Sequence, residues 1–453
     1  MFDEKEILNL GLDHVRRKDY DQAIVIFSRL IELSPKCSEA YYCCGHAYEM
    51  LGKFSQAIHC YSSVLKYFPQ ESVAYYHRGC AYMKRGEPHK AMDEFTQAIR
   101  LQPDYSKAFY HRGMVHFSQG HIDAAFDDYN LAVAHDANDA DAYVARGLVH
   151  IVRKNIDAAI EDYDRAIARA PNHLKAHGNR GNALEMIKML PEAIEEYNVV
   201  IELNDKDHRA YMNRGYVYFT TENYEKSLAD YTKALELSPT NVKALCCRGS
   251  VYIKLNNNRR ALEDFDRAIE LTPKNCEAII NRGHAKLAMD NYGGAMADFN
   301  EVLKIDPANT KAWYNRGVIH AKTGDFPEAI NDYTEVLKFI PDDAPAYCYR
   351  GVVHTRMGNM DEAIKDYDRS IEIDPQYAIS WYNRGLVFRF QGRYHEAIDN
   401  FTIAIRLMPE YAPAYQNRAV TYSMLGNKER AESDLAMVDE LEQVQKAKQP
   451  VLV

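Results

Sequence analysis

The stretch TKAWYNRGVIHAKTGDFPEAINDYTEVLKFIPDD, residues 310–343, contains the features that decide the fold. Apolar residues recur at helical spacing in two blocks, and each block predicts a helix of about 20 Å. Gly317, Ala329, Tyr333 and Pro341 occupy fixed places in this stretch, and the same residue types return every 34 residues along the chain. The sequence is therefore a tandem array of one helical hairpin.

The glycine of this unit forms the clearest column. Gly occupies twelve of the thirteen positions that lie 34 residues apart between Gly11 and Ala419, with no insertion. An aromatic residue follows 16 positions later in every repeat except the last, which has Leu435. Small residues allow the two helices of a hairpin to approach closely, aromatic residues fill the space between neighbouring hairpins, and Pro ends the second helix.

These columns resemble the tetratricopeptide repeat family, and the resemblance covers nearly the whole chain. It implies an all-α fold, a right-handed α-solenoid superhelix in which the first helix of each repeat lines a concave groove. With Gly as position 8, the predicted repeats are 4–37, 38–71, 72–105, 106–139, 140–173, 174–207, 208–241, 242–275, 276–309, 310–343, 344–377, 378–411 and 412–445. Residues 1–3 precede the array, and we expect the last helix to extend as a polar cap into the tail, residues 446–453.

The bulk composition narrows the class of protein. Hydrophobic residues make up 47% of the 453 residues, and the net charge of −10 argues against a general nucleic-acid binder. No apolar run is long enough to span a membrane, and the start lacks the pattern of a signal peptide. The nine cysteines do not form a disulfide framework, so we expect a cytoplasmic location.

No motif for catalysis or for a cofactor is present. The sequence lacks a Gly-rich phosphate loop and a nucleophile elbow, so we expect no enzyme activity, no cofactor and no metal. Five histidines stand in a column where the family has Tyr, and we interpret them as packing residues because they lie in separate repeats: His14, His116, His150, His320 and His354. Cys44 and Cys60 are predicted neighbours, which we interpret as small core residues.

One column departs from the family pattern. The residue before Gly is usually Leu in the family, but it is Arg in repeats three to thirteen, from Arg78 to Arg418. Sixteen residues later, every Arg repeat carries an acid except repeat twelve, which has Asn400. Repeats one and two lack both partners. This correlation predicts an Arg–carboxylate bridge within each hairpin, partly buried between its helices, because the guanidinium fork fits a carboxylate. The alternative is that these arginines bind a ligand.

The family implies a binding groove lined by positions 2, 5, 6, 9, 12 and 13 of each first helix. Position 6 is Asn in six repeats, and its amide offers a donor and an acceptor to the backbone of an extended peptide. The alternative is that these amides are solvated or cap local turns. The candidate residues at position 6 are Asn179, Asn213, Asn281, Asn315, Asn383 and Asn417, together with His77 and His111 in repeats three and four.

Two further groups belong to the predicted groove. Position 5 carries tyrosines that pack either ligand side chains or adjacent first helices, among them Tyr42, Tyr76 and Tyr110. Position 2 carries Lys175, Arg209 and Lys243 in consecutive repeats, and Lys311 in repeat ten. With Asn179, Asn182 and Asn213, the three consecutive cations predict a basic, amide-rich stretch that suits an acidic segment or a chain-terminal carboxylate.

We therefore predict a non-enzymatic scaffold that binds extended or helical segments of partner proteins, without nucleic acid and without insertion into a membrane. The alternative is a co-chaperone adaptor with a carboxylate clamp like that of some family members. Asn182, Asn213 and Lys243 match that clamp, whereas Gly178 and Cys247 do not. Self-association is left open.

Overall fold

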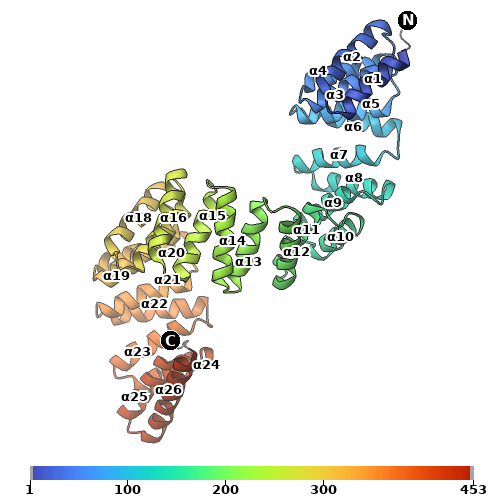
Figure 1. Cartoon of the computed structure of the whole chain (residues 1–453). Helices are drawn as coiled ribbons and strands as arrows, with labels where there is room; N and C mark the ends of the chain where they lie inside the picture. The colour runs from blue at the N-terminus through green and yellow to red at the C-terminus, as the bar shows by residue number, and fades with distance from the viewer. Residues whose placement is uncertain (1–3, 449–453) are drawn as a thin grey trace. The chain divides into compact units, whose positions relative to one another are not determined.

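The computed structural model describes residues 4–448, which are helical throughout apart from short connections; no strand occurs among them. The predictions for residues 1–3 and 449–453 lie outside the described residues. Each stretch of 34 residues contains two helices, which pair into one hairpin, as Figure 1 shows. The predicted all-α solenoid of helical hairpins is confirmed. We number the hairpins in chain order, so that hairpin one consists of α1 and α2.

The chain divides into two compact units, Met1–Leu237 and Ser238–Val453. The helices of the N-terminal unit are α1 (Glu4–Arg16), α2 (Tyr20–Leu33), α3 (Ser38–Met50), α4 (Phe54–Tyr67), α5 (Ser72–Lys84), α6 (Pro88–Leu101), α7 (Ser106–Ser118), α8 (Ile122–His135), α9 (Ala140–Val152), α10 (Ile156–Arg169), α11 (Leu174–Met186), α12 (Leu190–Leu203), α13 (His208–Thr220) and α14 (Tyr224–Leu237).

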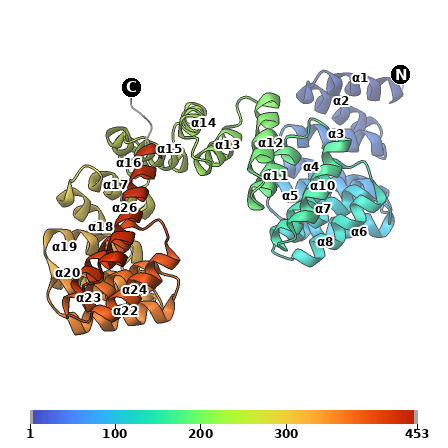
Figure 2. The same cartoon turned by 90° about the horizontal axis from the view of Figure 1, so that it is seen from below.

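The helices of the C-terminal unit are α15 (Val242–Lys254), α16 (Asn258–Leu271), α17 (Cys276–Leu287), α18 (Tyr292–Ile305), α19 (Thr310–Thr323), α20 (Phe326–Phe339), α21 (Ala344–Arg356), α22 (Met360–Ile373), α23 (Ala378–Phe390), α24 (Tyr394–Leu407), α25 (Ala412–Met424) and α26 (Lys428–Lys448). Figure 2 shows α26 in red; its 21 residues exceed the 14 of the other second helices, such as α24. Within residues 4–448, no helix combines the length and the apolar character needed to cross a membrane.

The glycine column brings the two helices of each hairpin together. A Cβ added at Gly181 would lie 2.8 Å from Cε1 of Tyr197, the aromatic residue 16 positions later, which is itself fully buried. Tyr163 makes the same contact with Gly147 and also packs in a cluster with Ala176 of the next hairpin. The aromatic residue therefore packs between the two helices of its own hairpin and also packs against the neighbouring hairpin.

The turn inside each hairpin uses a second column, which the sequence analysis did not single out. Position 15 has a positive φ in every hairpin, and seven of these residues are glycines: Gly52, Gly86, Gly120, Gly324, Gly358, Gly392 and Gly426. The other six are Lys18, Lys154, Lys188, Glu222, Asn256 and Asp290. A side chain in this conformation costs roughly 1–2 kcal/mol relative to a right-handed backbone, so six hairpins tolerate strain at the turn.

The first helices form the more closely packed side of each unit. In the N-terminal unit α11 contacts both α9 and α13, which are the first helices of the adjacent hairpins. In the C-terminal unit α23 likewise contacts α21 and α25. No pair of second helices among residues 4–448 makes a comparable contact. A stack whose first helices lie closer together curves toward them, so the inner face of each unit is the first-helix face.

Candidate functional site

The predicted bridge between Arg and an acid is present in the hairpins. Arg316 donates from Nε to Asp332 Oδ2 at 3.0 Å and from Nη2 to Oδ1 at 2.6 Å, and the Asp332 side chain is only 1% exposed. The prediction is confirmed by Arg78–Glu94, Arg112–Asp128, Arg146–Asp162, Arg180–Glu196, Arg214–Asp230, Arg248–Asp264, Arg282–Asp298, Arg316–Asp332, Arg350–Asp366 and Arg418–Asp434, which we call the Arg–acid ladder. In hairpin twelve, Arg384 donates to Asn400 Oδ1 at 2.9 Å.

The same guanidinium also reaches the preceding hairpin, a contact that the sequence analysis missed. Nη1 of Arg316 donates to Asn300 Oδ1 at 2.7 Å, and the Arg316 Cζ lies 4.5 Å from the centroid of the Trp313 ring. The signal was a column of Ser, Thr, Asn and Asp located 16 residues before each Arg. Because all three nitrogens of the Arg316 guanidinium are engaged, few donors remain for a ligand, and Arg316 acts as a structural link.

Hairpin six interrupts the regular geometry of the ladder. His177 stands where the adjacent hairpins have Tyr, and its Nδ1 lies 2.7 Å from Glu196 Oε2 while its Nε2 lies 2.9 Å from the Pro171 carbonyl oxygen. Glu196 accepts a single hydrogen bond from Arg180, through Oε1 at 2.6 Å. The residue after His177 is Gly178, which stands in a column where every other repeat carries a larger side chain.

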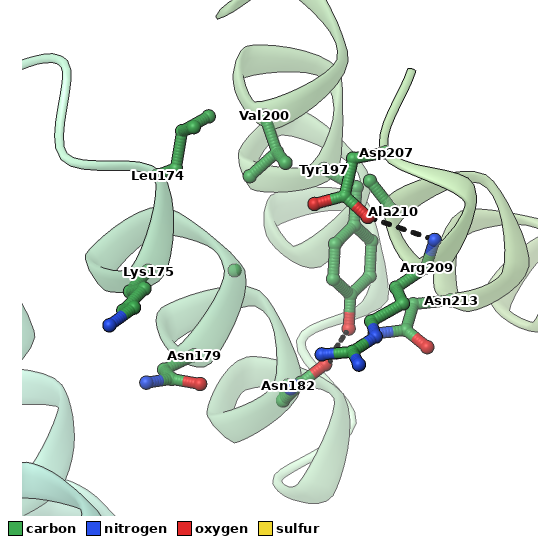
Figure 3. Close-up of a pocket in the computed structure, with 11 residues that line it drawn as sticks. Leu174, Lys175, Asn179, Asn182, Tyr197, Val200, Asp207, Arg209, Ala210 and Asn213 are labelled. Carbon is green, nitrogen blue, oxygen red and sulfur yellow. Dashed lines mark hydrogen bonds between the residues drawn. The ribbon is translucent and has the colours of Figure 1, made fainter. Parts of the chain in front are cut away.

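A hollow of about 210 Å³, which we call the Gly178 pocket, opens between α11 and α13. A Cβ added at Gly178 would meet only Cγ2 of Val200, at 4.0 Å, so the missing side chain creates the space. Figure 3 shows Lys175 and Asn179 on the α11 side of the pocket and Arg209 on the α13 side. The pocket therefore lies on the first-helix face of the N-terminal unit.

One side of the Gly178 pocket is an amide network. Asn213 donates from Nδ2 to Asn182 Oδ1 at 2.9 Å, and the same oxygen accepts a hydrogen bond from the Tyr197 hydroxyl at 2.8 Å. Burial raises the pKa of Tyr197, so this hydroxyl stays a donor at neutral pH. The network holds Asn182 and Asn213 in place.

The charges around the Gly178 pocket are mostly cationic. Lys175 and Arg209 are both exposed, and neither forms an ion pair within residues 4–448. The one acid in the lining, Asp207, accepts a hydrogen bond at 2.9 Å from the backbone N of Arg209, which caps the start of α13. Two exposed cations and one hydrogen-bonded carboxylate favour an anionic or carbonyl group as the occupant.

The asparagines at position 6 differ in their partners. Four of them donate to a residue in the preceding hairpin or to a backbone carbonyl in their own helix: Asn213 to Asn182, Asn315 to Lys311, Asn383 to Cys348, and Asn417 to Tyr382 and Pro413. The side chains of Asn179 and Asn281 form no hydrogen bond with another residue of the described part of the chain. Those two amides are therefore the ones available to a ligand.

The aromatic candidates at positions 5 and 6 pack against one another. Tyr76 is only 8% exposed, and its hydroxyl lies 3.3 Å from Nδ1 of His111. The rings of Tyr42 and His77 meet edge to face with centroids 5.1 Å apart, and Tyr110 approaches Tyr129 at 6.1 Å. This arrangement matches the alternative that these tyrosines pack between adjacent helices. Burial lowers the pKa of His111.

Two further hollows lie on first helices. A hollow of about 310 Å³ in the N-terminal unit is lined by apolar side chains such as Met114 and Leu148, and it shares Lys175 and Asn179 with the Gly178 pocket. A hollow of about 600 Å³ in the C-terminal unit is lined by residues that include Asn281, Lys311 and His284. Lys243 also belongs to the C-terminal unit, and it is exposed on α15.

The hairpin stack and its polar first-helix face define a helical-repeat protein. Family profiles for the tetratricopeptide repeat match residues 14–81, 76–143, 144–208, 208–241, 242–275, 283–324, 310–343, 344–377 and 366–399. These matches cover most of the chain, which therefore belongs to the tetratricopeptide repeat family. Repeats of this family generally mediate protein–protein interactions, and the architecture supports a protein-interaction scaffold.

Several solved structures resemble this chain. The APC/C hetero-tetramer Cut9–Hcn1 is 14% identical, with a TM-score of 0.44 over 97% of this chain and 94% of that chain. A tetratricopeptide repeat protein from Parabacteroides merdae is 21% identical, with a TM-score of 0.47 over 55% of this chain and 98% of its own. MamA is 26% identical, with a TM-score of 0.34 over 37% of this chain and 97% of its own. No curated protein sequence matches the chain.

Proposed function

We propose that the first-helix face of the N-terminal unit binds an extended segment of a partner protein, without covalent chemistry, and that an acidic or amide side chain of that segment enters the Gly178 pocket. The observation that carries the proposal is the pocket itself, which exists because Gly178 lacks a side chain. Its cations at Lys175 and Arg209 suit an anionic side chain, and the Asn179 amide is available to the peptide backbone.

The adjacent apolar hollow adds a second contact. Because Lys175 and Asn179 line both hollows, a segment that places a carboxylate in the Gly178 pocket also passes the apolar surface of Met114 and Leu148. An apolar side chain of the segment would bury surface there, and each Å² of apolar surface removed from water would stabilise the complex by about 25 cal/mol. The preferred ligand is therefore a segment that carries an acid and an apolar residue close together.

The carboxylate-clamp hypothesis remains a prediction and is not the function we favour. Asn182 and Asn213 are hydrogen bonded to each other, and Lys243 belongs to the other unit. The C-terminal unit offers its own hollow at Asn281 and Lys311, where the unbonded Asn281 amide repeats the situation of Asn179. We propose a second, weaker segment-binding site there.

Selection of peptides from a random display library tests the main proposal. Peptides selected on the full-length chain are expected to be enriched in Asp or Glu, and their affinity is expected to fall at least about tenfold, or about 1.4 kcal/mol, for Gly178→Tyr. Tyr occupies the same column in five other repeats, so the hairpin can accommodate it. Charge reversal by Arg209→Glu is expected to weaken the same peptides and to remove the preference for acids.

Gly293→Tyr is the matched control. A Cβ at Gly293, on the second helix α18, would meet nothing within 4 Å, so this variant adds the same side chain outside the first-helix face. It is expected to bind like the wild type. Equal affinity of the selected peptides for Gly178→Tyr and for the wild type would show that the pocket is not the site.

A further inference from the structure

Hairpin two replaces the Arg–acid ladder with a pair of thiols. Cys44 on α3 and Cys60 on α4 occupy the places that Arg and the acid occupy in later hairpins, and both are buried, at 2% and 6% exposure. Gly45 allows the close approach, since a Cβ added there would lie 3.2 Å from Cβ of Cys60. Two thiols therefore face each other between the helices of one hairpin.

The two thiols belong to one core cluster and differ in acidity. The neighbouring Cys60 thiol lowers the pKa of Cys44, and the Ser28 hydroxyl of the preceding hairpin adds to this effect. The neighbouring Cys44 sulfur and burial raise the pKa of Cys60. Cys44 is therefore the sulfur that more readily becomes a thiolate, and Cys60 is the one that keeps its proton.

A route for a small reagent leads to this pair. In the ladder hairpins a long Arg side chain fills the place of Cys44, but in hairpin two a hollow of about 500 Å³ remains. Cys44, Cys60, Ser28, Tyr48 and His59 line it, and it opens to solvent. A peroxide molecule fits such a space, and so does the extra oxygen of a sulfenic acid.

We propose that Cys44 and Cys60 form a redox-active dithiol that a peroxide converts into a disulfide. The Cys44 thiolate attacks one peroxide oxygen, the O–O bond breaks, and Cys44 becomes a sulfenic acid while hydroxide leaves. The Cys60 sulfur then attacks the Cys44 sulfur, the S–O bond breaks, and the hydroxyl leaves as water with the Cys60 proton. The released hydroxide takes up the proton that Cys44 lost on ionisation, so one peroxide is reduced to two waters. The new S–S bond ties α3 to α4 where the ladder ties the later hairpins.

Peptide mapping of the full-length chain tests this proposal. The protein is treated with hydrogen peroxide, unfolded in the presence of an alkylating reagent, and digested with trypsin. Cleavage after Lys36, Lys53 and Lys66 gives peptides 37–53 and 54–66. The expected product is the two peptides joined, two hydrogen atoms lighter than their sum, and dithiothreitol is expected to separate them. Cys348 is buried without a thiol neighbour, so it is expected to stay reduced during the peroxide treatment and then to be alkylated.

Two serine variants assign the link, because peptide 37–53 also contains Cys37 and Cys43. The joined peptide is expected to persist in Cys43→Ser and to disappear in Cys44→Ser, with helix content checked by circular dichroism. Persistence of the link in Cys44→Ser would overturn the proposal. So would a wild-type chain in which Cys60 stays as fully alkylated after peroxide treatment as Cys348. If a variant folds poorly, fragmentation of the joined wild-type peptide identifies the cysteine linked to Cys60, and a link from Cys37 or Cys43 would equally overturn the proposal.

Discussion

Hairpins one and two have the same architecture as the later hairpins but contain none of the Arg–acid ladder. Hairpin one has Leu10 and Ile26 where hairpin ten has Arg316 and Asp332, yet its helices have 13 and 14 residues, like those of hairpin five. In both regions the aromatic ring packs on the glycine of its own hairpin. The hairpin geometry is thus set by the glycine and the aromatic residue, and the ladder position accepts apolar, thiol or ionic pairs.

The comparison also shows what the ladder adds. An apolar pair at these positions contributes packing contacts but no hydrogen bonds. Arg316, by contrast, donates hydrogen bonds to Asp332 in its own hairpin and to Asn300 in the preceding one. A buried ion pair adds little net stability over a well-packed apolar pair, but it is costly to break by removing one partner. Removal of one partner of an Arg–acid pair should therefore destabilise the hairpin more than replacement of both partners by apolar residues.

The largest effect is expected for Asp332→Ala. The substitution leaves Arg316 largely buried without its carboxylate, and we expect a loss of about 3 kcal/mol in the free energy of unfolding. Urea denaturation followed by circular dichroism measures it. Cys60→Ala, at the same position in hairpin two, removes no charge and is expected to cost less than half as much. Equal losses at the two sites would contradict the comparison.

The double variant Arg316→Leu with Asp332→Ile sharpens this test. It gives hairpin ten the residues of hairpin one, and no unpaired charge remains, so its loss is expected to be smaller than that of Asp332→Ala alone. The double variant should still have a lower free energy of unfolding than the wild type, because the contacts of Arg316 with Asn300 and Trp313 disappear. A double variant less stable than the single one would mean that the ladder is required in the later hairpins.

An intermediate effect is expected from the two glycines of α11. Gly181→Ala places a Cβ 2.8 Å from the Tyr197 ring, and we expect this overpacking to cost about 1–3 kcal/mol. Gly178→Ala meets only Val200 at 4.0 Å and replaces glycine within a helix, so it is expected to stabilise by about 0.5–1 kcal/mol. Thermal melts of the two variants should move in opposite directions. If Gly178→Ala also lowers the melting temperature, the Gly178 pocket is not open space.

The sequence predicted the fold and the ladder because both appear as columns within one chain. Gly, the aromatic residue and the Arg–acid pair recur at fixed spacing, and the two ladder-free repeats showed which residues are partners. The contact of Arg316 with Asn300 was missed because Ser, Thr, Asn and Asp all fill that column. Chemically different residues serve there because each supplies an oxygen that accepts a hydrogen bond.

The candidate site was less accessible to sequence reasoning. Gly178 was treated as a mismatch to a known clamp, whereas its importance lies in the space that it leaves. The asparagine column was visible, but which amides are bonded internally depends on side-chain orientation. Asn417, for example, donates to Tyr382 and Pro413, while Asn179 has no such bond. A single residue type in one column does not distinguish these cases.

The smallest effect is expected at the turns, where the comparison runs between glycine and non-glycine hairpins. Lys188 has φ 65°, in the conformation that Gly120 adopts at φ 78° in hairpin four. Lys188→Gly relieves the strain of the side chain but makes the unfolded chain more flexible, so we expect a net gain of no more than about 1 kcal/mol. Gly120→Lys is the reverse substitution, made in hairpin four, and should destabilise by a similar amount. A lower melting temperature for Lys188→Gly would show that contacts of the lysine outweigh the strain of its backbone.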